Sequence, residues 1–135
     1  MKAAALLSSA LLLLLVSVIP AQSSGKTPIS VLVANSVTGS PNKTYSTFVV
    51  FRGILLGGLT RLQQSDKDFC FTYTEDPNYG PFLQSVNGLP GCEQEQTYWK
   101  LLVKKPNNTV IVPDVGIGCY IPSADDQIIL KYSKY

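Results

Sequence analysis

A single segment of helical periodicity, followed only by short strand-like segments, constrains the fold of this chain most strongly. Within residues 46–64, apolar side chains recur at the three- and four-residue spacing of one helix face: Phe48, Phe51, Leu55, Leu59 and Leu62. Three glycines in the same segment, Gly53, Gly57 and Gly58, oppose a helix by about 1 kcal/mol each relative to alanine. We therefore expect a helix that uses the missing side chains to lie close against a sheet.

The apolar segments after this helix are short and are separated by turn residues. Residues 69–74 alternate, with Phe69, Phe71 and Tyr73 on one face, as in a half-buried strand. Asn87-Gly88 indicates a hairpin, because both central positions of a type I′ turn need a positive φ. Further strands are predicted over residues 29–34, 82–86, 98–103, 109–112 and 127–132, with a turn at 76–80 and irregular chain over 113–126. This order predicts an α+β, β-grasp-like fold in which one helix packs on a mixed sheet of about four to five strands.

The N-terminal residues have the pattern of a secretory signal peptide. Lys2 precedes an apolar run from Ala3 to Ile19, and Pro20-Ala21 follows. The run is shorter than the roughly 20 apolar residues of a membrane-spanning helix, which disfavours an anchor. We predict a signal peptide at residues 1–23 and one secreted, extracellular domain at residues 24–135, with no membrane association.

The cysteines and two sequons fit that compartment. Cys70, Cys92 and Cys119 are expected to form one intramolecular disulfide in an oxidising environment, and the sequence leaves open which two of them pair. Asn42 and Asn107 each begin an Asn-x-Thr sequon in a turn-rich segment, which predicts a glycoprotein.

Composition excludes several classes of function. The chain has no histidine, so neither a Ser-His-Asp nor a Cys-His catalytic unit can form, and the commonest metal ligand is missing. No C-x-x-C spacing supports a zinc site, and the scattered basic residues, with a net charge of +2, do not form the basic face that nucleic-acid binding needs. We therefore predict a non-enzymatic protein with no metal site and no nucleic-acid partner.

An ordered set of short segments resembles a known family. The segments are residues 71–73 (FTY), 78–80 (NYG), 85–89 (SVNGL), 97–102 (TYWKLL), 114–122 (DVGIGCYIP) and 126–131 (DQIILK). Together they are similar to the small C-terminal domain of the vitamin B12 carriers, the family of transcobalamin, gastric intrinsic factor and haptocorrin. The likeness extends from about Ile29 to Tyr135, nearly the whole predicted domain.

The resemblance implies a protein that binds and transports cobalamin or a related corrinoid, with no catalytic cofactor. In the carriers the small domain covers the upper face of the corrin ring, and a large helical domain holds the other side. By resemblance, the ligand-binding residues are Tyr79, Gly80, Val86, Asn87, Gly88, Leu89, Tyr98, Trp99, Gly116, Ile117, Gly118 and Tyr120. A corrin is a broad disc with an apolar plane and amide-bearing edges, and aromatic side chains with polar tips suit such a ligand.

Little chain precedes the predicted strand at Ile29, so we do not expect the large helical domain here. Tight binding is then expected to need a second surface, from a helical partner chain, a receptor or a homodimer. The alternative is a secreted protein-interaction module that kept the fold and lost cobalamin binding.

Overall fold

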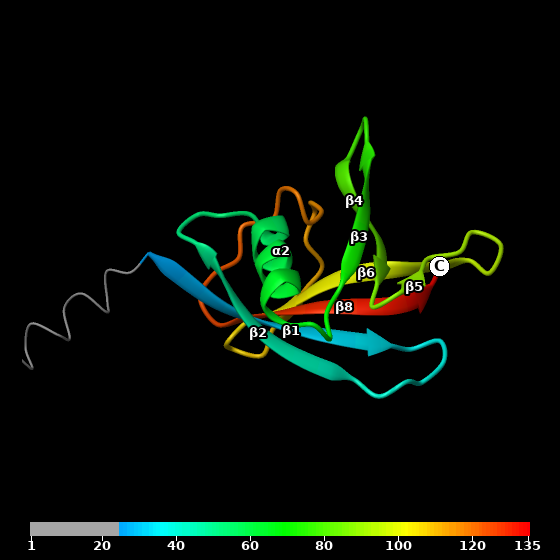
Figure 1. Ribbon diagram of the computed structural model, residues 1–135, viewed down its shortest axis with the longest axis horizontal. Helices are drawn as coiled ribbons and strands as arrows, with labels where there is room; N and C mark the ends of the chain where they lie inside the picture. Colours follow the sequence, from blue (N-terminus) through cyan, green and yellow to red (C-terminus); the bar gives the residue numbers. More distant parts are fainter. Residues whose placement is uncertain (1–24) are drawn as a thin grey trace, which may run out of the picture.

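Within residues 25–135, a mixed five-stranded sheet carries one helix on one of its faces (Figure 1). The computed structural model describes residues 25–135, and the predicted signal peptide lies outside them. The sheet has the order β2-β1-β8-β6-β7. Its strands are β1 (Lys26–Asn35), β2 (Lys43–Val50), β6 (Thr97–Lys104), β7 (Val110–Ile111) and β8 (Asp126–Lys134). β1 and β8 are parallel and the other neighbours are antiparallel, which confirms the predicted α+β fold with one helix on a mixed sheet.

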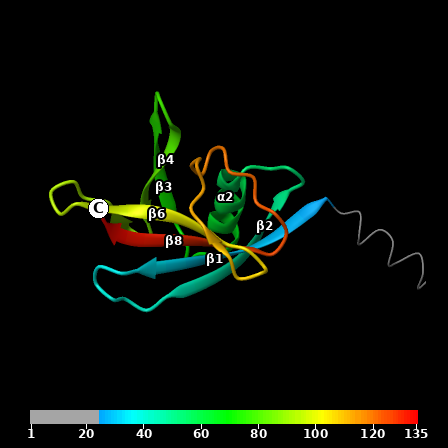
Figure 2. The same ribbon diagram turned by 180° about the vertical axis from the view of Figure 1, so that it is seen from behind.

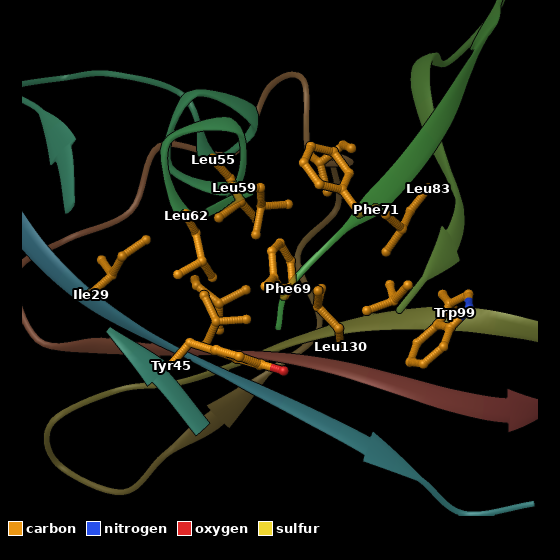
Figure 3. Packing of buried hydrophobic residues seen from close by; sticks show 14 of the residues in the cluster. Ile29, Tyr45, Leu55, Leu59, Leu62, Phe69, Phe71, Leu83, Trp99 and Leu130 are labelled. Atoms are coloured by element: carbon orange, nitrogen blue, oxygen red, sulfur yellow. The ribbon is translucent and has the colours of Figure 1, made fainter. Parts of the chain in front are cut away.

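The helix α2 (Leu55–Ser65) is shorter than the sequence predicts. Its buried face is the predicted one, with Leu55, Leu59 and Leu62 turned toward the sheet (Figure 3). Gly58 permits this close packing, since a Cβ there would lie 2.8 Å from a methyl group of Val49.

The predicted helix start at residue 46 is wrong, because residues 46–50 belong to β2. In this strand Tyr45 and Val49 face the core and pair in register with Val31 and Thr27 of β1. The chain then turns at Arg52, which has a positive φ of 61°. Phe48 and Phe51 thus mimic helical spacing while lying in a strand and the turn that follows it.

A second, three-stranded sheet stands beside the helix and consists of β3 (Phe71–Asp76), β4 (Gly80–Val86) and β5 (Leu89–Pro90). The β3–β4 hairpin rises from the five-stranded sheet on the side that carries α2, as both ribbon views show (Figures 1 and 2). Asn87 and Gly88 have φ values of 51° and 82°, which confirms the predicted turn between β4 and β5.

The predicted alternation of residues 69–74 holds at the base of this hairpin only. Phe69 and Phe71 are buried, whereas Tyr73 is 42% exposed. An irregularity in the β3–β4 register between Thr72 and Tyr73 accompanies this change. Beyond that point the hairpin leaves the core on the side of β3, and only Leu83 of β4 stays buried there, whereas Phe82 and Tyr79 are exposed.

The hydrophobic core lies between the five-stranded sheet and the elements above it (Figure 3). Ile29, Tyr45 and Leu130 of the sheet meet the leucines of α2, while Trp99 lies on the hairpin side near Leu83. Within residues 25–135, no helix is long and apolar enough to cross a membrane.

The predicted irregular chain between β7 and β8 is tied to the start of α2. Ile54, the residue before the helix, makes no side-chain capping hydrogen bond. Instead, Leu55 N donates to Tyr120 O at 2.8 Å, and Leu56 N donates to Ile117 O at 2.9 Å. These carbonyls satisfy donors that a helix leaves open at its first turn, and they fix the segment that carries Gly116 to Tyr120.

Candidate functional site

An apolar cleft of about 260 Å³ opens between the β3–β4 hairpin, strand β6 and the segment after β7. The hairpin contributes one wall, β6 the floor, and the segment after β7 the other wall. The lining residues are Pro81, Phe82, Leu83, Tyr98, Trp99, Lys100, Leu101, Val112, Pro113, Gly116 and Ile117. Phe82 is 53% exposed and Val112 is also exposed, so the rim presents apolar side chains to solvent.

A second cleft of about 350 Å³ shares Phe82, Leu83, Tyr98 and Trp99 with the first. It continues along β6 toward the start of that strand at Thr97, near the C-terminal residue Tyr135, and adds Cys92, Glu93 and Tyr135 to the lining. The Tyr98 ring lies edge-on to Tyr135, with ring centroids 5.7 Å apart. The two clefts therefore flank a shared group of aromatic side chains on β4 and β6.

Trp99 belongs to the core and also to the cleft. Its side chain is 6% exposed, and its indole Nε1 donates to Leu89 O at 2.7 Å. Its ring packs against Tyr132 at 5.0 Å between centroids. The indole is thus fixed in position with a small part of its surface at the cleft floor.

The structure brings some of the predicted site residues together at the first cleft. Tyr98, Trp99, Gly116 and Ile117 line it directly. Gly118 packs next to it, because a Cβ on Gly118 would lie 2.7 Å from the Pro81 ring. The missing side chain at Gly118 therefore allows the segment after β7 to contact the hairpin, which sets the separation of the two walls.

Other predicted site residues lie elsewhere. Asn87 and Leu89, with the buried Val86, line a different hollow of about 210 Å³ against the end of β1. The Asn87 side chain accepts a hydrogen bond from Cys70 N at 3.1 Å and donates one to the Tyr45 hydroxyl at 3.3 Å. Asn87 therefore ties the turn to β2 and to the segment before β3, and its exposed neighbour Gly88 supplies the turn geometry.

Tyr79 and Gly80 lie at the tip of the hairpin, where Tyr79 is 79% exposed. Asp76 accepts hydrogen bonds from Asn78 N and Tyr79 N at 2.8 and 3.0 Å, which closes the predicted turn. Gly80 immediately precedes the lining residue Pro81. The tip is thus above the cleft wall rather than in the cleft.

Tyr120 reaches a buried carboxylate rather than the cleft. Its hydroxyl donates to Asp126 Oδ2 at 2.9 Å, Ser123 N donates to the same oxygen at 3.0 Å, and Lys105 Nζ lies 3.0 Å from both carboxylate oxygens. Burial, followed by the hydrogen bond and charge of Asp126, raises the pKa of Tyr120. Burial pulls the pKa of Lys105 down, but the hydrogen bonds and charge of Asp126 outweigh it and leave the pKa raised. This cluster pins the segment after β7 to the start of β8.

Several lining residues were not predicted, chiefly Phe82, Leu83, Leu101, Val112 and Pro113. Leu101 lies inside the TYWKLL segment on which the resemblance rests, so it would have been predicted if every residue of that segment had been taken as a candidate. Phe82 carries no signal in the sequence, because its position on the wall depends on how the hairpin stands against β6.

The remaining predictions have mixed outcomes. The three cysteines are free thiols in the structure, so it contains no pair for the predicted disulfide. Asn42 and Asn107 are exposed, and glycosylation stays a prediction. Among the side chains of residues 25–135, no group of three or more Cys, Asp and Glu is arranged to hold a metal ion.

A family profile described as "Domain of unknown function (DUF4430)" matches residues 60–134, more than half of the chain. The chain belongs to the DUF4430 family. This DUF4430 chain is also 29% identical to human transcobalamin-1 over 97 residues, which is 70% of the chain and 21% of transcobalamin-1. It therefore spans about a fifth of that curated relative.

Solved structures share the fold of this DUF4430 domain. Haptocorrin, in a crystal structure in complex with Cbi, superposes with a TM-score of 0.65 and 22% identity, over 81% of this chain and 26% of haptocorrin. A protein from Ruminococcus gnavus superposes with a TM-score of 0.56 and 15% identity, over 81% of this chain and 98% of that protein. The predicted resemblance to the small C-terminal domain of the vitamin B12 carriers is confirmed.

Proposed function

We propose that this domain is a secreted, non-enzymatic binding module that holds one face of a corrinoid against the cleft between β4, β6 and the segment after β7. The observation that carries the proposal is the similarity to human transcobalamin-1 over 70% of the chain, joined to the position of Tyr98, Trp99, Gly116 and Ile117 in one apolar cleft. These four residues come from two segments of the sequence, Tyr98-Trp99 on β6 and Gly116-Ile117 after β7, and the resemblance implied all of them as ligand contacts.

The chemistry of the cleft suits a flat, largely apolar ligand. Phe82, Leu83 and Val112 offer apolar area, and Tyr98 adds a polar tip. The volume of about 260 Å³ is below the roughly 300–1,000 Å³ of sites that enclose a small molecule. A corrin therefore rests on this cleft by one face and leaves the other face to solvent.

One-sided contact limits the affinity. Association costs roughly 4 kcal/mol or more in lost translational and rotational freedom. The favourable free energy of contact with a single face of the ligand must first offset this cost. We infer that the isolated monomer binds cobalamin no more tightly than about micromolar. Tight binding then requires a second surface, from a helical partner chain, a receptor or a second copy of this chain.

Trp99 provides the test, because it is the only tryptophan and lies at the cleft floor. The secreted protein is titrated with cobinamide and with cobalamin, with correction for absorption by the ligand, and we expect saturable quenching at micromolar concentrations or above. The Trp99→Phe variant is the control for residual signal. Nanomolar binding by a proven monomer would contradict the need for a second surface. No binding in any oligomeric state would contradict the proposed function and favour an interaction module that lost the ligand.

A further inference from the structure

The face of the five-stranded sheet that lies opposite α2 has no layer over it. Both α2 and the β3–β4 hairpin stand on the other side, and no element of residues 25–135 covers this one (Figures 1 and 2). Successive side chains of a strand point to opposite faces of a sheet. Because Leu130 and Tyr132 are buried in the core, Lys131 between them lies on the uncovered face, which we call the open face.

Strand register gathers three lysines on the open face. Lys100 of β6 lies directly opposite Lys131 of β8, so both side chains point to the same face. Lys104 follows four residues later on β6 and therefore shares that face, roughly 13 Å along the strand from Lys100. The basic residues are scattered along the sequence, and only the pairing of β6 with β8 brings these three together.

No carboxylate neutralises these lysines. Asp126 is the only acidic residue in the five strands, and it points to the core side of the sheet, where it holds Lys105 at 3.0 Å. That contact is the only ion pair within the described part of the chain, so the three lysines of the open face have no carboxylate partner there. Like charges directly opposite each other in a sheet are destabilising. The Lys100–Lys131 pair therefore favours an anion that lies between the two ammonium groups.

We propose that the open face binds a linear sulfated polysaccharide, with one sulfate between Lys100 and Lys131 and another at Lys104. A single small anion cannot reach both positions, because they are roughly 13 Å apart along β6. A chain that carries a sulfate on each of several sugars reaches both. This site goes beyond the proposed corrinoid cleft, which lies on the core side of the sheet and is bordered by only one of the three lysines, Lys100.

The centre of the open face favours a polysaccharide over a protein partner. Leu32, Ile129 and Leu102 lie side by side there in cross-strand register, and each is half-buried. A protein interface takes most of its affinity from a few large anchors, mainly Trp, Tyr and Arg, that are well packed at its centre. No such anchor stands between the lysines. A polysaccharide binds mainly through its charged groups and needs no apolar anchor.

A charge-matched pair of double variants tests the site. Lys104→Gln/Lys131→Gln removes two charges from the open face and leaves Lys100 in place at the border of the cleft. Lys43→Gln/Lys67→Gln is the matched control, because both of its lysines are exposed and lie elsewhere: Lys43 pairs with Val33, which packs on the core side, and Lys67 lies in the turn after α2.

The probe is a heparin dodecasaccharide, titrated into the purified protein at several salt concentrations. At about 50 mM NaCl, Lys104→Gln/Lys131→Gln should bind at least about tenfold more weakly than the parent. The slope of log K against log [NaCl] should become shallower by about two, one for each lysine removed. Lys43→Gln/Lys67→Gln should keep the affinity and the slope of the parent. Equal losses in the two double variants would overturn the site, since net charge alone would then explain the binding.

Thermal melting gives a second readout that needs no ligand. Lys131→Gln removes the like charge opposite Lys100, so this variant should melt at a higher temperature than the parent at low salt. The difference should vanish at about 1 M NaCl, where charges on the surface are screened. Identical melting at low salt would contradict the repulsion on which the proposal rests.

Two further probes identify the kind of polyanion. N-acetylheparosan dodecasaccharide keeps carboxylates and lacks sulfates, so it should bind far more weakly than heparin, and equal binding would overturn the role of sulfate. Double-stranded DNA should also bind more weakly than heparin at the same salt concentration. Tighter binding of DNA would overturn the polysaccharide and assign the open face to nucleic acid. None of these outcomes bears on cobinamide, which is tested separately through Trp99.

Discussion

The side of the five-stranded sheet that carries α2 has two contrasting halves. Under α2, Leu55 and Leu59 are fully buried against Val31 and Val49 of the sheet. Under the β3–β4 hairpin, Leu83 and Trp99 are buried, but Phe82 and Tyr79 extend into solvent. The first half is closed and the second is open, so this domain separates the region that stabilises the fold from the region that has surface left for a ligand.

The hydrogen bonds explain why the halves differ. The Thr47 hydroxyl donates to Gly58 O at 3.3 Å, and Arg61 donates to Phe48 O at 3.1 Å, so α2 is bound to the neighbouring β2. The hairpin, in contrast, contacts β6 without pairing with it, and the edge of β6 at Trp99 and Leu101 stays open. A wall that does not complete the sheet leaves a cleft beside it.

The largest expected effect comes from truncating a buried side chain in the closed half. Phe69 is 1% exposed and packs edge-on against Tyr45 at 5.2 Å between ring centroids. Phe69→Ala should lower the free energy of unfolding by about 3–5 kcal/mol, the usual cost of truncating a buried phenylalanine. Urea denaturation of the purified protein measures this change in the free energy of unfolding.

Phe82→Ala is the matched control on the open wall. Its free energy of unfolding should stay within about 0.5 kcal/mol of the parent, as for other exposed positions, while its affinity for cobinamide should fall. Equal destabilisation by the two substitutions would remove the distinction between a closed and an open half.

A smaller effect is expected at the carboxylate that holds the cleft wall. Asp126→Asn should cost roughly 1–3 kcal/mol, because Lys105, Tyr120 and Ser123 N lose a charged acceptor at a buried position. It should also weaken cobinamide binding, since the segment with Gly116 and Ile117 loses its attachment to β8. Asp125→Asn is the control at an exposed neighbour and should change neither quantity. A stable Asp126→Asn variant with unchanged binding would show that this cluster does not position the wall.

Two glycines should respond in opposite directions to the same substitution. Gly88 has a φ of 82° with open space around it, so Gly88→Ala should destabilise by about 1 kcal/mol through backbone strain alone. Gly57 also has open space where an added methyl group would lie, but it belongs to α2, so Gly57→Ala should stabilise by roughly 0.5–1 kcal/mol. Thermal melting of both variants gives the signs, and equal signs would contradict the turn or the helix assignment.

Alkaline pH should produce the smallest effect. The pKa values of Tyr120 and Lys105 are raised above their ordinary values of 10.0 and 10.5, so the folded state holds these protons more tightly than the unfolded state. Their contribution to stability is therefore complete below about pH 10 and is lost as the pH rises through the folded-state values. Unfolding midpoints between about pH 8 and 11 should fall less steeply in Asp126→Asn than in the parent. Parallel slopes would exclude the cluster as the cause.

The sequence predicts what depends on local pattern. Alternation identified Phe69 and Phe71 as inward, and Asn87-Gly88 identified a turn whose two positive φ values need those residues. The sequence did not predict β2, because Phe48 lies in the strand and Phe51 in the turn after it, and their three-residue spacing coincides with that of a helix. Only pairing with β1, a contact between segments, reveals the strand.

For the candidate site, too, the prediction succeeds within sequence segments and fails where the position of a residue depends on contacts between segments. The resemblance implied Tyr98, Trp99, Gly116 and Ile117 together, and the structure places all four at one cleft. It could not give Phe82, whose position follows from the angle of the hairpin. Nor could it give the open edge at Leu101, which exists because β7 is only two residues long. Both features depend on how segments that are separate in the sequence are placed next to β6, which local sequence patterns do not show.

Hydrogen–deuterium exchange of the purified protein, with and without saturating cobinamide, tests the central claim most directly. The account predicts added protection in residues 98–102 and 112–118, and unchanged exchange in α2 and in β1. Added protection confined to α2, to β1 or to the turn at Asn87 would contradict a ligand site in the open half of the sheet.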